Sequence, residues 1–388
     1  MSSDSVVIIG AGIAGAATAY FLSRQGVKNV VLLDREKQPG VHSTGRNAAI
    51  LRTAIPHPEL HHLGWKSKQF YESPPPGFTE TPLVDPVGLF LAATDDQIVG
   101  TSRDLQAWLE DPTCSKGGEN ADPSQLYDLY PELAKRVDYV HHFANEGVFD
   151  VDAILSGFLR GARQAGVEVR LCNEARRLLV ENGKIVGVAT DEEVIPAQKA
   201  VLAGGGWAAD LADAAGYPLP LQPIRRHILV TARIPELDPK GPVVWLGGDE
   251  FYFRPESGGL LMSACDTQPV SAAEGELAQH QTIEEIAIKA ERWLPGFDQL
   301  GAAHYWAGMR TFAPDPLFVV GPDPRLSGLH WVAGLGGHGI TCGAAVGSLA
   351  ADWICGKKSS YPYARDLLPG RFFDQSDNRS STGIEIGK

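Results

Sequence analysis

A glycine-rich hexapeptide near the N-terminus constrains the fold more than any other feature of this chain. Residues 10–15 have the pattern GxGxxG; they follow the continuous apolar run 6–9 and precede an alanine-rich stretch, residues 13–25. A β-branched run bounded by glycine is typical of a strand buried on both faces, and the alanine-rich stretch has the composition of a helix. A second apolar run, residues 30–33, ends in Asp34. The chain therefore opens with a predicted strand–helix–strand unit.

The spacing of these glycines predicts a dinucleotide site. In such a unit Gly10 allows the tight turn, Gly12 lets a pyrophosphate approach the backbone, and Gly15 lets helix and strand pack closely. The N-terminus of the helix attracts the phosphates. Asp34 stands about 20 residues further on, where a carboxylate accepts hydrogen bonds from a ribose. This carboxylate serves NAD and FAD equally well.

Composition excludes several classes of protein. The chain has 388 residues, which gives two to three domains at about 150 residues each. Its formal net charge of -13 disfavours nucleic acid as a partner, although a few arginines can still bind a small anion. The five cysteines are scattered without CxxC spacing, which argues against a disulfide framework and a metal site. Since the start is not a secretory signal and no run of 18 apolar residues occurs, we expect a cytoplasmic protein without a membrane span.

The rest of the chain alternates between two kinds of pattern. Two alternating apolar segments flank Asn182 and Gly183, which is a strong hairpin signal. Residues 199–203 predict another buried strand that is stopped by glycines. The stretch 218–310 is richer in alternating and aromatic segments and predicts an antiparallel sheet, whereas a strand–glycine–helix pattern returns at 329–354.

Three further motifs indicate which dinucleotide is bound. They are residues 40–49 (GVHSTGRNAA), 306–310 (WAGMR) and 331–340 (WVAGLGGHGI). Together with the N-terminal unit, these motifs resemble the D-amino-acid oxidase superfamily of flavoproteins over most of residues 5–355. Within it the chain resembles D-arginine dehydrogenase most, and it is also similar to glycine and sarcosine oxidases. The resemblance implies FAD as the cofactor and oxidation of the CH–NH bond of a small amino acid.

Three other functions are alternatives to the oxidation of an amino acid. Oxidation of a 2-hydroxy acid at its CH–OH bond is the main alternative, because residues 45–49 also resemble that branch. The glycine-rich turn before the last helix argues against an NAD(P)-dependent enzyme. A flavin-binding module without activity would not need the arginines described below.

The resemblance also implies an α/β fold with two domains. A Rossmann-like FAD-binding domain is expected at residues 1–80, 145–217 and 311–365. A second, α+β substrate domain built on an antiparallel sheet is expected at 81–144 and 218–310. The polar, Ser-rich residues 371–388 are expected to form a flexible tail.

The FAD-binding residues follow from the same resemblance, and their chemistry suits the role. The hydroxyls and the cation of residues 43–46 belong beside a pyrophosphate, and the amides of residues 336–339 begin a helix whose positive end suits the flavin pyrimidine edge. The expected set is Gly10, Gly12, Ile13, Ala14, Gly15, Asp34, Arg35, Ser43, Thr44, Arg46, Asn47, Ala48, Ala49, Gly204, Gly205, Trp207, Arg310, Gly336, Gly337, His338, Gly339 and Ile340.

Four residues are the catalytic candidates. By the family pattern, Arg226 and Arg310 bind the substrate carboxylate and Tyr252 supports the same group; a bidentate guanidinium–carboxylate pair would orient the α-carbon against the flavin. Arg225 is adjacent to Arg226 and can exchange roles with it. His338 either contacts the flavin or is a packed polar side chain. No general base is expected, since in this family the hydrogen leaves as hydride once the amine is neutral.

Departures from the D-arginine dehydrogenase pattern bear on the substrate. The acidic residue that meets cationic side chains there falls at Leu89, and two polar loop residues fall at Ile50 and Ile55. An apolar wall would leave a guanidinium substrate unpaired, so neutral or acidic substrates are expected to be preferred to basic ones. Arg52 stands in the same loop, and it meets a second carboxylate, assists the first or faces solvent.

Two residues that bind flavin covalently or activate oxygen in sarcosine-oxidase-type enzymes have no counterpart in this sequence. Residues 311–316 contain no cysteine of the kind that sarcosine-oxidase-type enzymes link to flavin, so noncovalent FAD is expected. Residues 261–265 contain no counterpart of the lysine that activates oxygen in those oxidases, which favours a dehydrogenase. The electron acceptor, oxygen or a quinone or carrier, is left open.

Overall fold

The predicted strand–helix–strand unit lies at the centre of a six-stranded sheet. The computed structural model describes residues 5–55, 57–94, 118–134 and 136–373. In it β1 (Val6–Ile9) and β2 (Val30–Leu33) pair in parallel, and α1 (Ile13–Arg24) connects them, as predicted. The strand order is β20-β21-β13-β1-β2-β9, and only β20 is antiparallel to its neighbour. The remaining strands are β9 (Glu168–Arg170), β13 (Lys199–Leu202), β20 (Val319–Pro322) and β21 (Leu329–Ala333).

Helices cover this sheet because their small residues allow close approach. The helix predicted after the C-terminal glycine-rich turn is α8 (Gly339–Ile354), and it packs against α1 and α2 (Pro58–Glu72). A Cβ at Gly347 would lie 2.6 Å from the Cβ of Ala17, so only glycine permits this crossing of α8 over α1. The helix α5 (Val151–Gln164) also packs against α1.

The hairpin predicted at Asn182 and Gly183 is confirmed. Strands β10 (Ala175–Glu181) and β11 (Lys184–Thr190) pair antiparallel around this turn, and β12 (Val194–Pro196) completes a small sheet. Both turn residues have positive φ, 50° and 72°, as a two-residue hairpin loop requires.

A second, nine-stranded sheet forms the other part of the molecule. It has the order β18-β14-β17-β16-β15-β5-β7-β6, with β19 paired to β14. The expected antiparallel pattern holds except between β5 and β15, which are parallel. Its strands are β5 (Leu89–Ala93), β6 (Glu119–Ala121), β7 (Tyr139–Phe143), β14 (Gln222–Thr231), β15 (Val243–Leu246), β16 (Phe251–Glu256), β17 (Gly259–Ser263), β18 (Gln268–Pro269) and β19 (Ala302–Phe312).

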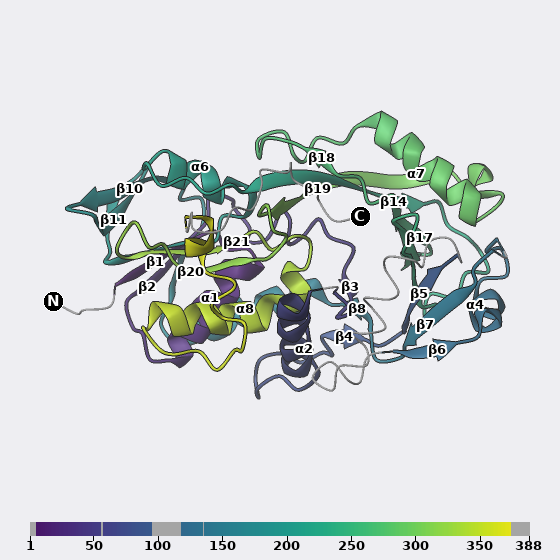
Figure 1. Ribbon diagram of the computed structural model, residues 1–388, viewed down its shortest axis with the longest axis horizontal. Helices are drawn as coiled ribbons and strands as arrows, with labels where there is room; N and C mark the ends of the chain where they lie inside the picture. Colours follow the sequence, from purple (N-terminus) through teal and green to yellow (C-terminus); the bar gives the residue numbers. More distant parts are fainter. Residues whose placement is uncertain (1–4, 56, 95–117, 135, 374–388) are drawn as a thin grey trace.

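Two connections position the site between the two sheets. The long strands β14 and β19 extend from beside the six-stranded sheet to the vicinity of β17 in the second sheet (Figure 1). A short sheet of β3 (Ile50–Leu51), β8 (Gly147–Phe149) and β4 (Val84–Asp85) holds the loop that follows β3. The helices α4 (Pro123–Leu129) and α7 (His280–Trp293) pack against the second sheet, and the helix α6 (Ala208–Asp213) follows β13.

The expected tail does not begin at residue 371. The Arg371 Nε donates to the Asp315 Oδ2 at 2.6 Å, and Arg371 belongs to the short 3-10 helix Pro369–Phe372. This ion pair fixes the backbone beyond the predicted boundary; residues 374–388 lie outside the described part of the chain.

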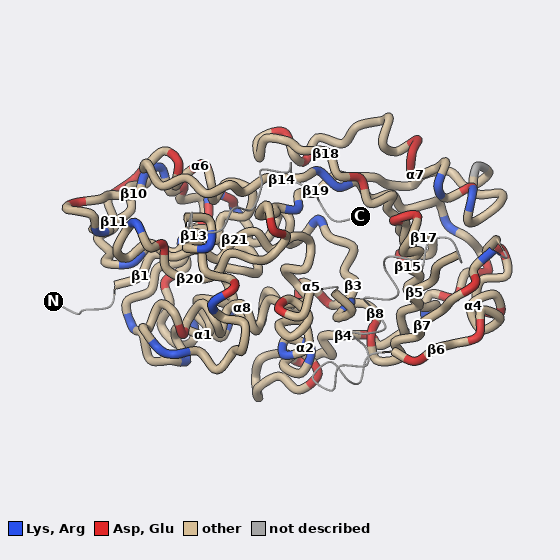
Figure 2. Tube along the Cα trace, in the orientation of Figure 1, with Lys and Arg blue, Asp and Glu red and all other residues tan. Residues whose placement is uncertain are grey.

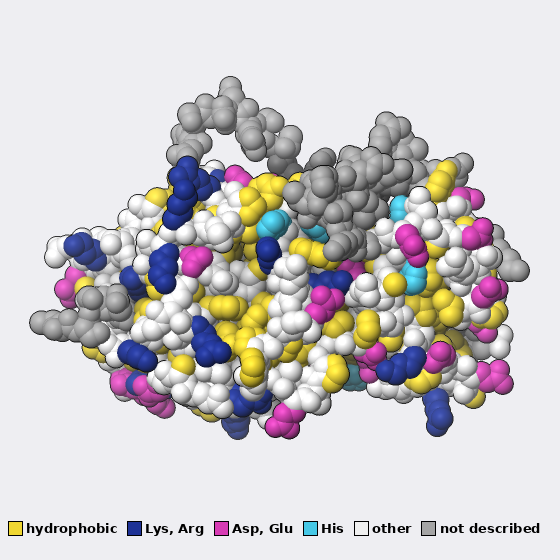
Figure 3. All heavy atoms as spheres, turned by 90° about the horizontal axis from the view of Figure 1, so that it is seen from below, with side chains coloured by type: hydrophobic (Ala, Val, Ile, Leu, Met, Phe, Trp, Pro, Cys, Tyr) yellow, Lys and Arg dark blue, Asp and Glu magenta, His cyan; other side chains and the backbone are white. Residues whose placement is uncertain are grey.

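No single sign of charge dominates the described part of the chain. Acidic and basic residues both occur at the two ends of the molecule in Figure 2, and the face in Figure 3 mixes them with hydrophobic side chains. None of the helices in the described ranges combines the length and apolarity needed to cross a bilayer.

Candidate active site

A cavity of about 640 Å³ joins the glycine-rich turn to the second sheet. Gly10, Gly12 and Asp34 line one end, and Arg226, Tyr252 and Arg310 line the other. All the residues that the sequence proposed for cofactor and substrate line this cavity, apart from Gly15, Ala49 and Leu89. The structure therefore brings the two predicted groups of residues into one continuous space of the size typical of ligand sites.

The glycines of the turn have the steric roles that their spacing predicts. Gly10 has φ 107°, and a Cβ there would lie 2.5 Å from the carbonyl oxygen of Ala203. A Cβ at Gly15 would lie 1.9 Å from the carbonyl oxygen of Gly10, so this glycine acts through packing and not through the cavity wall. The side chain of Thr44 accepts a hydrogen bond from the amide of Ile13 at 3.1 Å, which fixes residues 40–49 against the start of α1.

Asp34 is held in place by backbone amides. Its Oδ2 accepts a hydrogen bond from Ala11 at 2.7 Å, and its Oδ1 accepts one from Glu36 at 2.9 Å. Since each carboxylate oxygen has a second lone pair, Asp34 keeps acceptor capacity for a ribose while lining the cavity.

A charged cluster closes over the outer part of the cavity. The ring nitrogens of His42 contact Glu36 and Glu276, each at 2.9 Å, and the Arg46 Nε lies 3.1 Å from the Glu276 carboxylate. Burial alone would lower the pKa of His42, but its hydrogen bonds to Glu276 and Glu36 outweigh burial and raise it. Arg46 therefore lines the cavity while already paired, which sequence reasoning did not foresee.

Aromatic contacts complete this outer cluster. The His42 ring lies 4.6 Å from the Trp207 ring, and the Arg35 guanidinium lies 4.0 Å from the same indole. His42 and Glu276 were not predicted as site residues, because Glu276 comes from a distant part of the sequence and only the tertiary structure joins it to residues 36–46.

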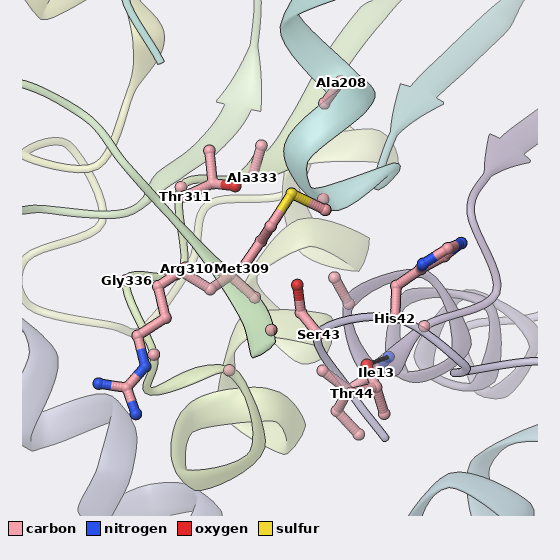
Figure 4. Close-up of a pocket in the computed structure, with 18 of the residues that line it drawn as sticks. Ile13, His42, Ser43, Thr44, Ala208, Met309, Arg310, Thr311, Ala333 and Gly336 are labelled. Atoms are coloured by element: carbon pink, nitrogen blue, oxygen red, sulfur yellow. Dashed lines mark hydrogen bonds between the residues drawn. The ribbon is translucent and has the colours of Figure 1, made fainter. Parts of the chain in front are cut away.

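The register of β14 and β19 brings the two carboxylate-binding candidates together. Ile224 pairs with Arg310 and Arg226 pairs with Gly308, so the two arginines are diagonal neighbours on one face of this ladder. In Figure 4 the Arg310 side chain points away from Ile13 and Thr44, toward the inner end of the cavity. Burial and the charge of Arg226 lower the pKa of Arg310.

Arg225 and Arg226 have different surroundings. Arg225 donates hydrogen bonds to the Gln268 side chain at 2.9 Å and to the Glu274 carbonyl at 2.8 Å, and it does not line the cavity. The Nε of Arg226 is buried without a hydrogen-bond partner among the described residues. Arg225 therefore cannot take the place of Arg226 in the cavity without leaving these two hydrogen bonds.

Tyr252 lies fully buried beside the arginines. Its ring stacks on Trp245 with centroids 4.6 Å apart, and its hydroxyl meets no partner in hydrogen-bonding geometry within the described ranges. Burial raises the pKa of Tyr252 although Arg310 and Arg226 oppose that change. The phenol therefore stays protonated and can donate a hydrogen bond to an anion.

His338 stands at the start of α8 and lines the cavity. Burial lowers its pKa to about 3, and the charges of Arg52 and Arg310 act in the same direction. A histidine with this pKa is neutral near neutral pH, so it offers a hydrogen bond and not a positive charge.

The residues of the loop after β3 line the cavity, whereas Leu89 lies outside it. Ile50, Arg52 and Ile55 line the inner end of the cavity. Leu89 does not: it is fully buried in an apolar cluster with Phe143 and other residues of the second sheet, because β5 lies between β15 and β7. The expectation that Leu89 forms the pocket wall is therefore wrong. This end of the cavity is also lined by Trp245, Glu250, His57 and Cys265, none of which was proposed as a site residue from the sequence.

Comparisons with known proteins agree with this geometry. Residues 5–353 match the family model described as FAD dependent oxidoreductase. The chain is 26% identical to the uncharacterized oxidoreductase YurR of Bacillus subtilis, covering 94% of this chain and 97% of that protein. It is also 26% identical to a glycine oxidase of Pseudomonas aeruginosa, covering 93% and 98%. The fold matches the crystal structure of L-proline dehydrogenase from P. horikoshii with TM-score 0.83 at 21% identity, covering 95% of this chain and 98% of that one.

Proposed function

The chain belongs to the FAD-dependent oxidoreductase family, and from this premise we propose that it oxidises the carbon–nitrogen bond beside the carboxylate of an amino-acid-like substrate. Its cofactor is FAD. The glycine oxidase among its relatives supports a substrate of this class. The observation that carries the proposal is the convergence of Arg226, Arg310 and Tyr252 in the cavity that begins at the glycine-rich turn.

The residues at the outer end of the cavity fit the cofactor. Gly10 and Gly12 line the cavity where a pyrophosphate would approach the turn, and Asp34 retains acceptor capacity for a ribose. The turn before α8, with Gly336 and Gly337 at positive φ, brings backbone along the cavity wall. FAD supplies the two-electron acceptor of the reaction.

Arg226, Arg310 and Tyr252 are proposed to bind and orient the substrate carboxylate. Two guanidinium groups present only donors and the protonated phenol offers one more, whereas a carboxylate presents only acceptors. When these groups hold the carboxylate, the α-carbon has a fixed position in the cavity, so the substrate is bound in an orientation suited to reaction. The nearby guanidinium charges also lower the pKa of a substrate amine, since they disfavour its ammonium form. The chain thereby favours the neutral amine without a dedicated base.

An anaerobic substrate screen tests this function. We expect amino acids to bleach the flavin absorbance at about 450 nm at least tenfold faster than the matched 2-hydroxy acids, because one of the relatives is a glycine oxidase. Neutral and acidic amino acids are expected to exceed arginine and lysine by about tenfold or more in kcat/KM. Both enantiomers belong in the panel. Faster bleaching by hydroxy acids would assign the site to CH–OH oxidation instead.

The purified protein is expected to be yellow and to release its FAD on acid precipitation. Residues 311–316 contain no cysteine, and burial raises the pKa of Cys265, which lines the cavity as a thiol. A thiol is a poor nucleophile for covalent attachment. The measurement is flavin absorbance in supernatant and pellet, for the wild type and Cys265→Ser. Flavin retained in the wild-type pellet would overturn the noncovalent assignment, and its release from the variant would identify the attachment site.

A further inference from the structure

We propose that the inner end of the cavity is built for a substrate with two carboxylates, and that Arg52 binds the second one. This inference rests on the proposed function, since it assumes that Arg226 and Arg310 bind the first. It goes further by naming the substrate class: an acidic amino acid or another amine that carries two carboxylate groups.

Arg52 is fixed in the cavity by contacts that leave its charge available. Its Nε donates to the carbonyl oxygen of Ala54 at 3.0 Å, and its guanidinium lies 4.3 Å from the centre of the Trp245 ring. Trp245 in turn stacks on Tyr252. Arg52 and Tyr252 are therefore both in contact with the Trp245 indole, which places Arg52 close to the phenol that is proposed to contact the first carboxylate.

The charge at this end of the cavity is unbalanced. Arg52, Arg226 and Arg310 line it, and Glu250 is the carboxylate among the described residues that lines it with them. Within the described ranges, no carboxylate oxygen lies within 4.0 Å of any of these three guanidinium groups. Glu250 is the carboxylate whose charge acts most on Arg52, but it forms no ion pair with it among the described residues. Three guanidinium groups and one carboxylate leave a net charge of about +2 at this end of the cavity, which matches the charge of a dicarboxylate.

Glu146 does not neutralise Arg52. Its Oε1 accepts hydrogen bonds from the amide and the hydroxyl of Thr53, and it does not line the cavity. Burial raises the pKa of Glu146, which favours its neutral form. An uncompensated guanidinium in an enclosed site is costly, and a second substrate carboxylate removes that cost upon binding.

The walls between the two binding points suit the rest of such a substrate. Ile50, Ile55 and the Trp245 indole line the cavity near Arg52 and offer apolar contact to the methylene groups that separate two carboxylates. A basic side chain would instead meet Arg52 and be repelled. A neutral side chain would leave Arg52 unpaired, so the site distinguishes acid from amide by charge and not by shape.

A binding experiment on the FAD-loaded enzyme tests this assignment without turnover. The probes are malonate, succinate and glutarate, each beside its monoamide, with the dissociation constant measured from the flavin spectrum. We expect at least one diacid to bind about 30-fold or more tighter than its monoamide. Arg52→Met should reduce this ratio to about threefold or less, whereas Arg52→Lys should retain most of it. Arg170→Met, which removes only surface ion pairs, should keep the wild-type ratio.

Equal affinity of the wild type for every diacid and its monoamide would overturn the inference, and so would an unchanged ratio in an Arg52→Met protein that holds FAD. Anaerobic reduction by glutamate against glutamine, and aspartate against asparagine, separates this failure from that of the proposed function. If no amino acid reduces the flavin, the proposed function fails. If amides reduce it as well as acids do, only the dicarboxylate assignment fails.

Discussion

Replacing Arg310 by methionine is expected to remove about 3–5 kcal/mol of transition-state stabilisation, a loss in kcat/KM of roughly 10²- to 10⁴-fold, while FAD stays bound. The Arg310 side chain points to the inner end of the cavity, where no described carboxylate forms an ion pair with it. Its loss leaves the substrate carboxylate with one guanidinium. The measurement is steady-state kinetics with the best substrate of the screen, together with flavin content.

Two related variants make this prediction specific. Arg226→Met should cost as much as Arg310→Met or slightly less, since both arginines lie on one face of the β14–β19 ladder. Arg310→Lys should recover part of the loss, because it keeps the charge but not the bidentate geometry. If both methionine variants retain wild-type kcat/KM, the carboxylate lies elsewhere in the cavity.

Replacing Gly15 by alanine is expected to destabilise the fold by about 3 kcal/mol or more and to abolish FAD binding. The new Cβ would lie 1.9 Å from the carbonyl oxygen of Gly10, which is backbone and cannot rotate away. Helix α1 must then move off β1, and the turn that receives the pyrophosphate moves with it. Thermal unfolding and flavin content measure the two effects.

Gly301 offers a matched control for this substitution. A Cβ there meets no atom within 4 Å, and its φ lies outside the left-handed region. Gly301→Ala should therefore unfold at the wild-type temperature and keep its flavin. A Gly15→Ala protein with wild-type stability and flavin content would show that the close packing of α1 on β1 is dispensable.

Local signals predicted the glycine-rich turn and its flanking strands, which line one end of the cavity. Gly10, Gly12 and Asp34 could be placed from sequence because their spacing is fixed by one turn and two adjacent strands. The hairpin at Asn182 and Gly183 was predictable for the same reason, since its turn residues must adopt positive φ. Arg226 and Arg310 came from family resemblance, and the ladder register accounts for their meeting.

The site residues that could not be predicted from the sequence are brought to the cavity by tertiary packing. Trp245 and Glu250 reach the cavity because β15 and β16 pair there, and no local pattern records that pairing. Leu89 was wrongly expected in the pocket wall. Matching residues to a family pattern does not show which face of β5 is directed to the cavity and which to the apolar cluster. Glu276 was missed because it contacts His42 across 234 positions of the chain.

The two groups of cavity residues, those on β14 and β19 and those on the loop after β3, can change independently in evolution. The arginines that are proposed to bind the first carboxylate lie on a long two-stranded ladder, whereas Ile50, Arg52 and Ile55 lie on or just after the short strand β3. Under the proposed function, substitutions in that loop are expected to change which side chain is accepted without shifting the α-carbon. A lineage with this architecture can therefore diversify its substrates through few mutations while its chemistry is conserved.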